Sequence, residues 1–405
     1  EALIEAVEKI DIGGPTMLRS AAKNFAHLTV LCAPGQYDEY LAELEANGGE
    51  ASLGFRKRCA MAVFDRTSTY DRAIASYLLQ NGEEPTDPAA LPESLMLTGQ
   101  AKQTLRYGEN PHQRAVWYAS APQSGWANAQ QLQGKALSYN NLVDLEAARR
   151  IIAEFCDPAE DPTAAVLKHN NPCGMAQASS IATAYEKALA ADSVSAFGGI
   201  VALNRPLDAS TAEQMIQTFL ECIVAPACDA DAAEILAKKS NLRVLVLPDL
   251  VSGPPVTAKA IAGGWLVQDA DETLTPTADW DIVTDLKPDA AQLAEMAFAW
   301  RVVKHVKSNA IVVTGDRATL GVGAGQMNRV GAAKIALEQA GDRAQGGVLA
   351  SDGFFPFDDS VRTAAAAGIK VVVQPGGSIR DKDSIAAANE LGLVMAMTGT
   401  RHFLH

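Results

Sequence analysis

The sequence predicts an α/β fold with three layers, and three patterns along the chain indicate it. Short apolar runs such as 164–167 have the length of buried strands and alternate with amphipathic stretches of helical length. Polar, glycine-containing loops follow several of these runs, as they do at the carboxyl ends of strands in open sheets. The 405 residues are too many for one small core, so two or more domains are expected.

The amino-terminal region reads as a series of helices with one strand. A helical pattern opens the chain, and IDIGGP at 10–15 is a turn leading into a second helix. LTVLCAP at 28–34 has the pattern of a short buried strand. Further helices are expected at 37–49, where Asn-Gly-Gly ends the pattern, and at 55–80.

A stretch rich in proline and acidic residues, at 81–94, is the best candidate for a linker. We therefore expect one domain at 1–97 and a second region at 98–405. A second boundary is expected between 248 and 290, where proline and glycine interrupt the pattern. This boundary divides the second region into subdomains of about 98–255 and 256–405.

The second region contains signs of an internal duplication. Lys-His followed by Asn occurs at 168–170 and again as Lys304-His305 with Asn309. Each is followed by an aromatic and glycine loop, AFGG at 196–199 and DGFFPF at 352–357. The order of expected helices and strands around the two sites is also alike, which favours two related subdomains. Chance similarity of short strings is the competing interpretation.

The composition excludes several classes of protein. The chain has 48 acidic and 34 basic side chains, a formal net charge of −14, whereas general nucleic-acid binders are usually basic. A small anionic substrate would need lysine and arginine concentrated at its site. No apolar run has the length of a membrane-spanning helix, and the six cysteines contain no CxxC pair. We expect no membrane association, no disulfide framework and a cytoplasmic location.

Lys168 and His169 stand where an expected buried strand ends, which is a common place for ligand-binding residues. A histidine beside a lysine can act as a base, because the neighbouring cation lowers the imidazole's affinity for a proton. The alternative is a histidine that only stabilises its loop. A deaminase-type zinc site is not expected, because position 176 is Ala where the second cysteine would stand.

Two further loops have the character of ligand sites. The glycine-rich segment 319–333 carries Arg329 just inside an expected helix, where it could pair with a carboxylate or remain a solvated side chain. The run FFPF at 354–357 favours the wall of a pocket for a planar ring, with plain packing as the alternative. Arg106, Tyr107 and Arg401 could hold a phosphate or lie on the surface.

Many motifs, in this order, carry a resemblance that covers almost the whole chain. They are IDIGGP, LRYGENPHQ, KALSYNNLVDLEAA, LKHNNPCG, SAFGGIVALN, KSNAI, GVGAGQMNRV, SDGFFPF, GGSIRD and TRHFLH. Together they resemble the family of bifunctional purine-biosynthesis enzymes that joins AICAR formyltransferase to IMP cyclohydrolase. The set is specific, although no single member of it is.

The resemblance implies a fold and a reaction. It implies that 98–405 is the formyltransferase, built from two duplicated cytidine-deaminase-like subdomains without zinc. It also implies that 1–97 is part of a Rossmann-like, methylglyoxal-synthase-like cyclohydrolase domain, of which Asp11 and Lys23 match functional positions. The implied reaction moves a formyl group from 10-formyltetrahydrofolate to the 5-amino group of AICAR, giving FAICAR. In the family a substantial part of the cyclohydrolase domain precedes this region, so ring closure to IMP by this chain is in doubt.

The resemblance also assigns roles to residues. His169 would be the base, Lys168 its neighbouring cation, and Asn309 a positioning amide. The remaining implied contacts are those to the nucleotide, at Arg106, Tyr107, Gly198 and Arg401, and those to the folate, at Arg329, Phe354, Pro356, Phe357 and Asp359.

The resemblance further implies a homodimer with sites at its interface, no catalytic metal, and a structural potassium ion near Ser308 and Asp352. The expected partners are AICAR, FAICAR and the folate, with no nucleic acid and no membrane. Two other functions remain as alternatives. In one, cyclohydrolase is the main activity. In the other, the protein is a purine-nucleotide-binding subunit with an inactive site, against which the intact Lys168, His169 and Asn309 argue.

Overall fold

A computed structural model describes residues 3–80, 95, 97–120 and 124–405. The chain divides into two compact units, Glu1–Leu97 and Thr98–His405. The linker expected at 81–94 lies outside the described residues. Among those that are described, no helix is both long enough and apolar enough to cross a membrane.

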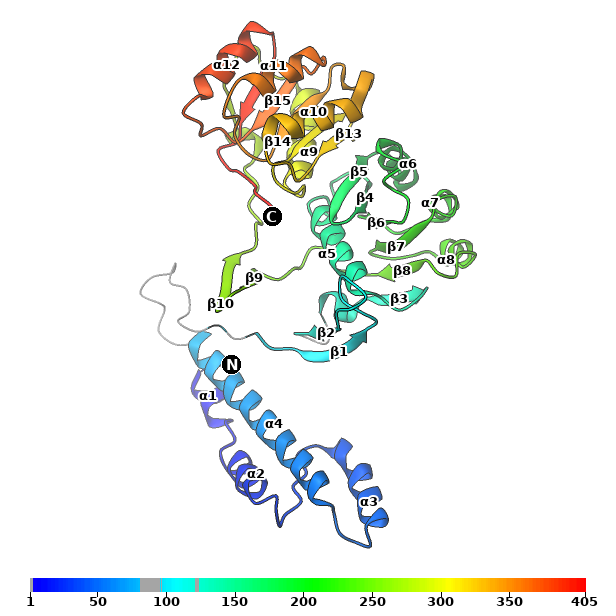
Figure 1. Ribbon diagram of the computed structural model, residues 1–405, viewed down its shortest axis with the longest axis vertical. Coiled ribbons are helices and arrows are strands. Elements are labelled where there is room, and N and C mark those ends of the chain that lie inside the picture. The colour runs from blue at the N-terminus through cyan, green and yellow to red at the C-terminus, as the bar shows by residue number, and fades with distance from the viewer. Residues whose placement is uncertain (1–2, 81–94, 96, 121–123) are drawn as a thin grey trace. The chain divides into compact units, whose positions relative to one another are not determined.

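All the regular secondary structure described in unit 1 is helical (Figure 1). The long helix α4 packs against α2 through Ala22, Ala60 and Val63, which are buried together with Val30. The α-helices are α1 (Leu3–Glu8), α2 (Gly13–Lys23), α3 (Tyr37–Ala46) and α4 (Leu53–Gln80).

The prediction of a strand at 28–34 is wrong. Residues 28–33 have no regular structure, and a single-turn 3₁₀ helix (Pro34–Gln36) follows them. An isolated strand leaves its backbone groups unpaired, and no other described segment of unit 1 is a strand that could pair with this one. The apolar run at 28–34 therefore indicated correctly that Val30 is buried, but it did not indicate the backbone conformation of this segment.

Unit 2 is built around a mixed sheet of twelve strands, which confirms the α/β class. The order across the sheet is β11-β16-β15-β14-β12-β13-β5-β4-β6-β7-β8-β3. In chain order the strands are β3 (Gln130–Gln133), β4 (Thr163–Lys168), β5 (Asn171–Gln177), β6 (Gly199–Leu203), β7 (Leu220–Ala225), β8 (Arg243–Val246), β11 (Asp281–Ile282), β12 (Ile311–Gly315), β13 (Ala318–Gly323), β14 (Val348–Ser351), β15 (Val371–Gln374) and β16 (Val394–Met397).

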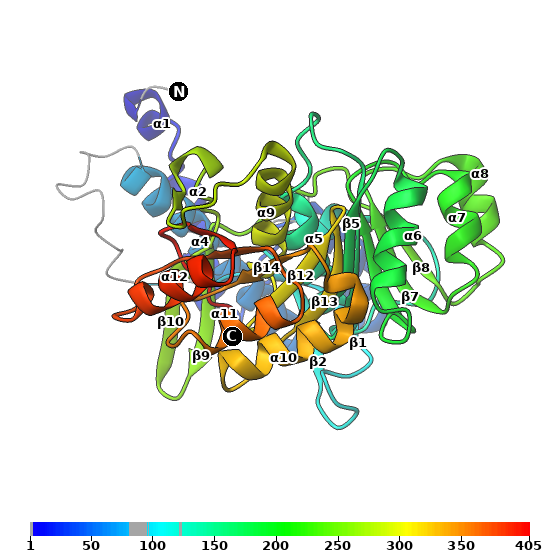
Figure 2. The same cartoon turned by 90° about the horizontal axis from the view of Figure 1, so that it is seen from above.

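Helices cover both faces of this sheet, which gives the three layers expected from the sequence. One face packs against α5 (Tyr139–Ala153) and α9 (Ala290–Val303) in a single core that spans the sheet. Figure 2 shows α9 and α10 on opposite faces of β12 and β14. The helices of the other face are α6 (Ile181–Ala191), α7 (Ala209–Met215), α8 (Ala230–Leu236), α10 (Arg329–Ala340), α11 (Asp359–Ala366) and α12 (Asp381–Glu390).

The order of elements repeats within unit 2. In the first half, α5 is followed by the β4–β5 hairpin and then by α6, β6, α7, β7, α8 and β8. In the second half, α9 is followed by the β12–β13 hairpin and then by α10, β14, α11, β15, α12 and β16. In each half the hairpin strands are antiparallel, the last three strands run parallel to one another, and an antiparallel edge strand completes the sheet.

The repeated motifs noted in the sequence do not occupy matching places. Residues His169 and Asn170 form the turn between β4 and β5, and the matching turn between β12 and β13 is Asp316-Arg317. Lys304 and His305 instead follow the end of α9. AFGG precedes β6, whereas DGFFPF follows β14. The two halves are therefore alike in the order of their elements, but the repeated sequence motifs lie at different positions in that order.

Two smaller sheets complete unit 2. They are the hairpin of β1 (Gln100–Leu105) and β2 (Ala115–Ala119), and the hairpin of β9 (Val256–Ile261) and β10 (Gly264–Asp269). The β9–β10 hairpin is largely exposed and carries apolar side chains, among them Trp265 and Leu266.

Glycines let the hairpins pack closely on their helices. A Cβ atom added at Gly174 in β5 would collide with the carbonyl oxygen of Ala188 in α6, and one added at Gly321 in β13 would collide with that of Ala336 in α10. We expect Gly174→Ala to lower the free energy of unfolding by about 1–3 kcal/mol, because backbone must move to admit the methyl group. Urea denaturation of the purified chain measures this loss.

The control for this prediction is Gly264→Ala in β10. A Cβ atom there has no neighbour within 4 Å, so its stability should match that of the unchanged chain. Equal stability of both variants would mean that the contact between β5 and α6 is not tight.

Candidate active site

Lys168 and His169 lie at the tip of the β4–β5 hairpin, where the sequence predicted a ligand site. The two turn residues, His169 (φ 50°) and Asn170 (φ 64°), both have left-handed backbone conformations. Asparagine and histidine adopt this conformation more often than most residues, but each does so at a cost that glycine does not incur. The turn is held from α5, because Asp144 Oδ1 accepts a hydrogen bond of 2.8 Å from the Asn170 N–H. His169 is exposed at this tip.

The Lys168 ammonium is oriented by backbone. Its Nζ donates to the carbonyl oxygens of Phe197 and Gly198, at 2.9 and 3.1 Å. Gly198 has φ +69°, and a Cβ atom there would lie 3.0 Å from Lys168 Nζ. A glycine is thus needed at 198 both for its conformation and for the approach of the lysine. An ammonium group has three N–H bonds, so one remains for another acceptor.

Asn309 is fixed at both ends of its amide in the second half of the unit. Its Nδ2 donates to the Gln326 carbonyl oxygen at 2.8 Å, and its Oδ1 accepts from Arg329 Nη2 at 2.9 Å. The amide therefore has one defined orientation, which suits the positioning role expected from the sequence.

Arg329 is buried, and its carboxylate partner is the protein's own Asp352, which is fully buried. The guanidinium also donates to Ser351 Oγ at 2.9 Å. Asp352 in turn accepts from the Ser308 hydroxyl at 2.6 Å and from the Ala310 N–H at 3.1 Å. A buried charge pair with this many hydrogen bonds is a rigid support, so Arg329 lies behind the surface rather than on it.

The FFPF run is divided between core and surface. Phe355 is fully buried, while Phe354 and Phe357 are 36% and 50% exposed. Pro356 and Asp359 are also exposed. The side chain of Arg380 stacks over the Phe357 ring at 4.9 Å. The exposed members are accessible to a ligand, whereas Phe355 anchors the loop.

Arg106 and Arg401 are exposed, and Tyr107 is half-buried. The Arg106 guanidinium stacks over the Tyr107 ring at 5.0 Å, and that of Arg401 stacks over Phe403 at 4.6 Å. The carboxyl-terminal segment that carries Arg401 is held by its neighbours. The Leu404 N–H donates to Ser308 Oγ, and the Ser308 N–H donates to the Leu404 carbonyl oxygen.

Several of these segments meet at one cavity of about 460 Å³. Its lining includes Leu105, Asn170 and Leu404. In the sequence, Leu105 and Asn170 are next to Arg106 and His169, and Leu404 is three residues after Arg401. Lys307 also lines it, and the Lys307 N–H donates to Asn171 Oδ1 at 3.0 Å. The structure thus brings the first-half hairpin, the segment before Asn309 and the carboxyl terminus together. Asp11 and Lys23 belong to unit 1, whose position relative to unit 2 is not defined.

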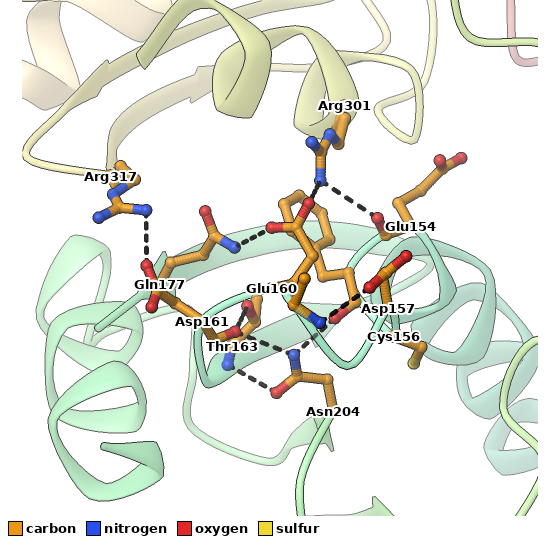
Figure 3. A network of polar contacts seen from close by, with 12 residues as sticks. Glu154, Cys156, Asp157, Glu160, Asp161, Thr163, Gln177, Asn204, Arg301 and Arg317 are labelled. Carbon is orange, nitrogen blue, oxygen red and sulfur yellow. Dashed lines mark hydrogen bonds and ion pairs between the residues drawn. The ribbon is translucent and has the colours of Figure 1, made fainter. Parts of the chain in front are cut away.

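The contact between the halves is charged, and Figure 3 shows part of it. Arg301 and Arg317, from the second half, bind Glu160 and Asp161 at 2.6 and 2.7 Å in the loop after α5. A further contact between the halves is made by Glu154, whose Oε1 lies 2.8 Å from Lys304 Nζ and 3.1 Å from His305 Nε2. Burial lowers the pKa of His305, and the hydrogen bond and negative charge of Glu154 oppose this shift.

Burial alone would raise the pKa of Glu154, but the hydrogen bond and charge of these two partners lower it to about 2. Lys304 and Glu154 are almost fully buried, with 2% and 14% of their side chains exposed. Neither Glu154, Asp144 nor Asn171 was singled out from the sequence. An acidic residue within or after a helix reads as ordinary surface, and only the fold shows what it faces.

Among the residues that the structure describes, no three His, Cys, Asp or Glu side chains gather closely enough to hold a metal ion. The six cysteines are free thiols. Burial raises the pKa of Cys173, the cysteine nearest the hairpin tip in sequence, to about 12. This thiol is therefore not a nucleophile at neutral pH.

The chain thus has an α/β unit whose two halves each contribute polar groups around one cavity. Comparison with known proteins identifies the family. The model of the AICARFT/IMPCHase bienzyme family matches residues 21–339, and the chain belongs to this family.

The curated relatives agree with this assignment. The bifunctional purine biosynthesis protein PurH of Acaryochloris marina is 71% identical over 406 residues, covering 100% of this chain and 77% of the relative. Those of Nostoc punctiforme and Rippkaea orientalis are each 65% identical, over 100% and 99% of this chain and 77% of each relative.

Glu154 predicts how stability depends on pH. Its pKa is below the ordinary value of 4.5, so its contribution is complete above pH 4.5 and is lost as the pH falls toward about 2. We expect Glu154→Gln to lose about 3–5 kcal/mol at pH 7, because Lys304 is left buried without its partner. The variant should also lose this part of the acid dependence. Urea denaturation at pH 7 and pH 3 measures both effects.

A matched control is Glu390→Gln, which removes one partner of the exposed pair with Arg362. Exposed pairs contribute about 0–1 kcal/mol, so this variant should stay close to the unchanged chain. Similar losses in both variants would show that the buried position of Glu154 has no special effect.

Proposed function

We propose that unit 2 transfers a formyl group from 10-formyltetrahydrofolate to the 5-amino group of AICAR, giving FAICAR and tetrahydrofolate in purine biosynthesis. Membership of the bienzyme family carries this proposal, since that family joins the formyltransferase to IMP cyclohydrolase. The oriented side chains of Lys168 and Asn309 support it, as does the contact that joins Lys307, two residues before Asn309, to Asn171 beside the turn that carries His169. A folate is accordingly the co-substrate.

The chemistry sets the demands on the site. The amine of AICAR is a weak nucleophile, because its lone pair is delocalised into the ring that bears the carboxamide. Attack on the formyl carbon forms a C–N bond and leaves an oxyanion, and the amine then loses a proton. The bond from the formyl carbon to N10 of the folate breaks next, and N10 takes up a proton. The site therefore needs a base and a donor for the oxyanion.

The roles we assign follow from these demands. His169, exposed at the hairpin tip, accepts the amine proton. Lys168 has an N–H bond free to stabilise the oxyanion or the leaving nitrogen, and the fixed amide of Asn309 orients the substrate.

We further propose where the two substrates bind. The nucleotide is bound by Arg106, Tyr107, Gly198 and Arg401. The guanidinium of Arg106 stacks on the Tyr107 ring and that of Arg401 stacks on Phe403, so each presents a positive charge beside an aromatic ring. The exposed members of the 354–359 loop, Phe354, Pro356, Phe357 and Asp359, contact the folate, and buried Arg329 supports that loop from behind. Gly353, next to Phe354, has no room for a side chain, because a Cβ atom would lie 2.6 Å from Arg329 Nη2.

We propose that the two halves of unit 2 are the duplicated cytidine-deaminase-like subdomains, at about 98–255 and 256–405. The repeated order of helices and strands supports this. Unit 1 would be the corresponding part of a methylglyoxal-synthase-like cyclohydrolase domain. In it Asp11 caps the first turn of α2, since its Oδ1 accepts from the Gly14 N–H at 2.9 Å, and Lys23 is exposed at the end of that helix.

A homodimer is part of the proposal. The exposed apolar side chains of the β9–β10 hairpin, Val256, Ile261, Trp265 and Leu266, support an association surface. Sedimentation equilibrium showing only a monomer would contradict it. We place the reaction in the cytoplasm.

The structural potassium ion expected near Ser308 and Asp352 stays a prediction of the resemblance. Both oxygens of Asp352 already accept hydrogen bonds, and Arg329 compensates the charge. No role in the reaction is assigned to such an ion.

The test is formation of FAICAR from AICAR and 10-formyltetrahydrofolate by the 405-residue chain, with EDTA present and absent. We expect turnover in both, and His169→Ala should lower kcat by roughly 10²–10⁴-fold with little change in AICAR binding. Near-normal turnover by this variant would mean that His169 only stabilises its loop. Loss of activity with EDTA and its return with zinc would contradict the metal-free reaction.

A further inference from the structure

The two hairpins of unit 2 share one structural device. In each, both residues of a two-residue turn have left-handed backbone, His169 and Asn170 in the first half and Asp316 (φ 52°) and Arg317 (φ 49°) in the second. In each, a carboxylate from the preceding helix binds the N–H of the second turn residue. Asp144 Oδ1 lies 2.8 Å from Asn170 N, and Glu295 Oε2 lies 2.7 Å from Arg317 N.

The shared device explains how these turns persist. Left-handed backbone costs an L-residue other than glycine about 1 kcal/mol or more, so a turn with two such residues needs support from outside. A half-buried carboxylate that accepts the turn's N–H supplies that support. This is the structural role that Asp144 and Glu295 have in common.

The surroundings of the two carboxylates differ. Asp144 lies close enough to His169 and Lys168 for their charges to act on it. Burial raises the pKa of Asp144, while the Asn170 N–H and the charges of His169 and Lys168 oppose the rise. Burial likewise raises the pKa of Glu295, whose charged neighbours are Asp316 and Arg317. Only the first carboxylate therefore stands beside the lysine–histidine pair.

We propose that Asp144 is a positioning residue of the formyl transfer, a role that rests on the function proposed above. Its carboxylate holds the turn that carries His169, and its negative charge stabilises the imidazolium. That cation forms when an N–H bond of the substrate amine breaks and the proton is bound by the His169 ring. Asp144 contacts neither substrate and takes up no proton itself.

The test compares matched variants of the 405-residue chain, Asp144→Asn and Glu295→Gln. In both, the amide oxygen can still accept the turn's N–H, so only the charge is removed. We expect Asp144→Asn to lower kcat for FAICAR formation by roughly 10- to 100-fold, with KM for both substrates and the melting temperature unchanged. Glu295→Gln should match the unchanged chain in all of these, and Asp144→Glu should recover part of the rate.

Other outcomes decide against the inference. Equal kcat values in Asp144→Asn and Glu295→Gln would show that the charge beside His169 has no part in the reaction. Failure of Asp144→Asn to fold, or a loss confined to KM or melting temperature, would reduce Asp144 to a support of the backbone. Absence of FAICAR formation by the unchanged chain would instead refute the proposed function, and this inference would fall with it.

Discussion

The arrangement of unit 2 depends on a buried carboxylate, Glu154, that binds two residues of the opposite half. Glu154 ends α5 in the first half, and its partners Lys304 and His305 follow α9 in the second. Because both charges of the pair are shielded from water, removing either leaves the other without compensation. The segment that begins at Lys304 is thereby fixed against the first half.

The rest of the candidate site follows along that segment. Lys307 binds Asn171, directly after the turn that carries His169. Ser308 then binds both Asp352 and Leu404, so the carboxyl terminus with Arg401 is attached at the same place. Asn309 comes next, and its amide is oriented by Gln326 and Arg329. Three consecutive residues, Lys307 to Asn309, thus join groups from distant parts of the sequence to one segment.

The two halves also show how one scaffold supports different chemistry. Where each hairpin begins, a backbone N–H donates to a side chain directly after β6 in the first half or β14 in the second. Thr163 N donates to Asn204 Oδ1 at 2.7 Å, and Ala310 N donates to Asp352 Oδ1 at 3.1 Å. The first half uses a neutral amide, and the second uses a carboxylate that also holds Arg329. The first half places its lysine and histidine at the hairpin tip instead.

The sequence allowed part of this to be predicted. The α/β class, the long helices and the polar loop after the strand at 164–167 follow from local patterns, which depend on nearby residues, whereas the second hairpin strand, β5, was not predicted. The prediction of a strand at 28–34 was wrong, because a strand needs a neighbouring strand for its hydrogen bonds, and an apolar run does not show whether one is present. The repeated Lys-His was matched to the wrong place, since Lys304 and His305 serve the contact with Glu154. The supporting acids Asp144, Glu154 and Glu295 are recognisable only once the helices are placed beside the turns.

A double-mutant cycle tests most directly whether the buried pair holds the site together. Glu154→Gln, Lys304→Met and the double variant would be compared in urea denaturation and in FAICAR formation. The account predicts that each single change lowers both stability and kcat. It also predicts that the double variant recovers much of the stability, with a coupling of about 1 kcal/mol or more. Additive losses of stability, with kcat unchanged in all three variants, would contradict it.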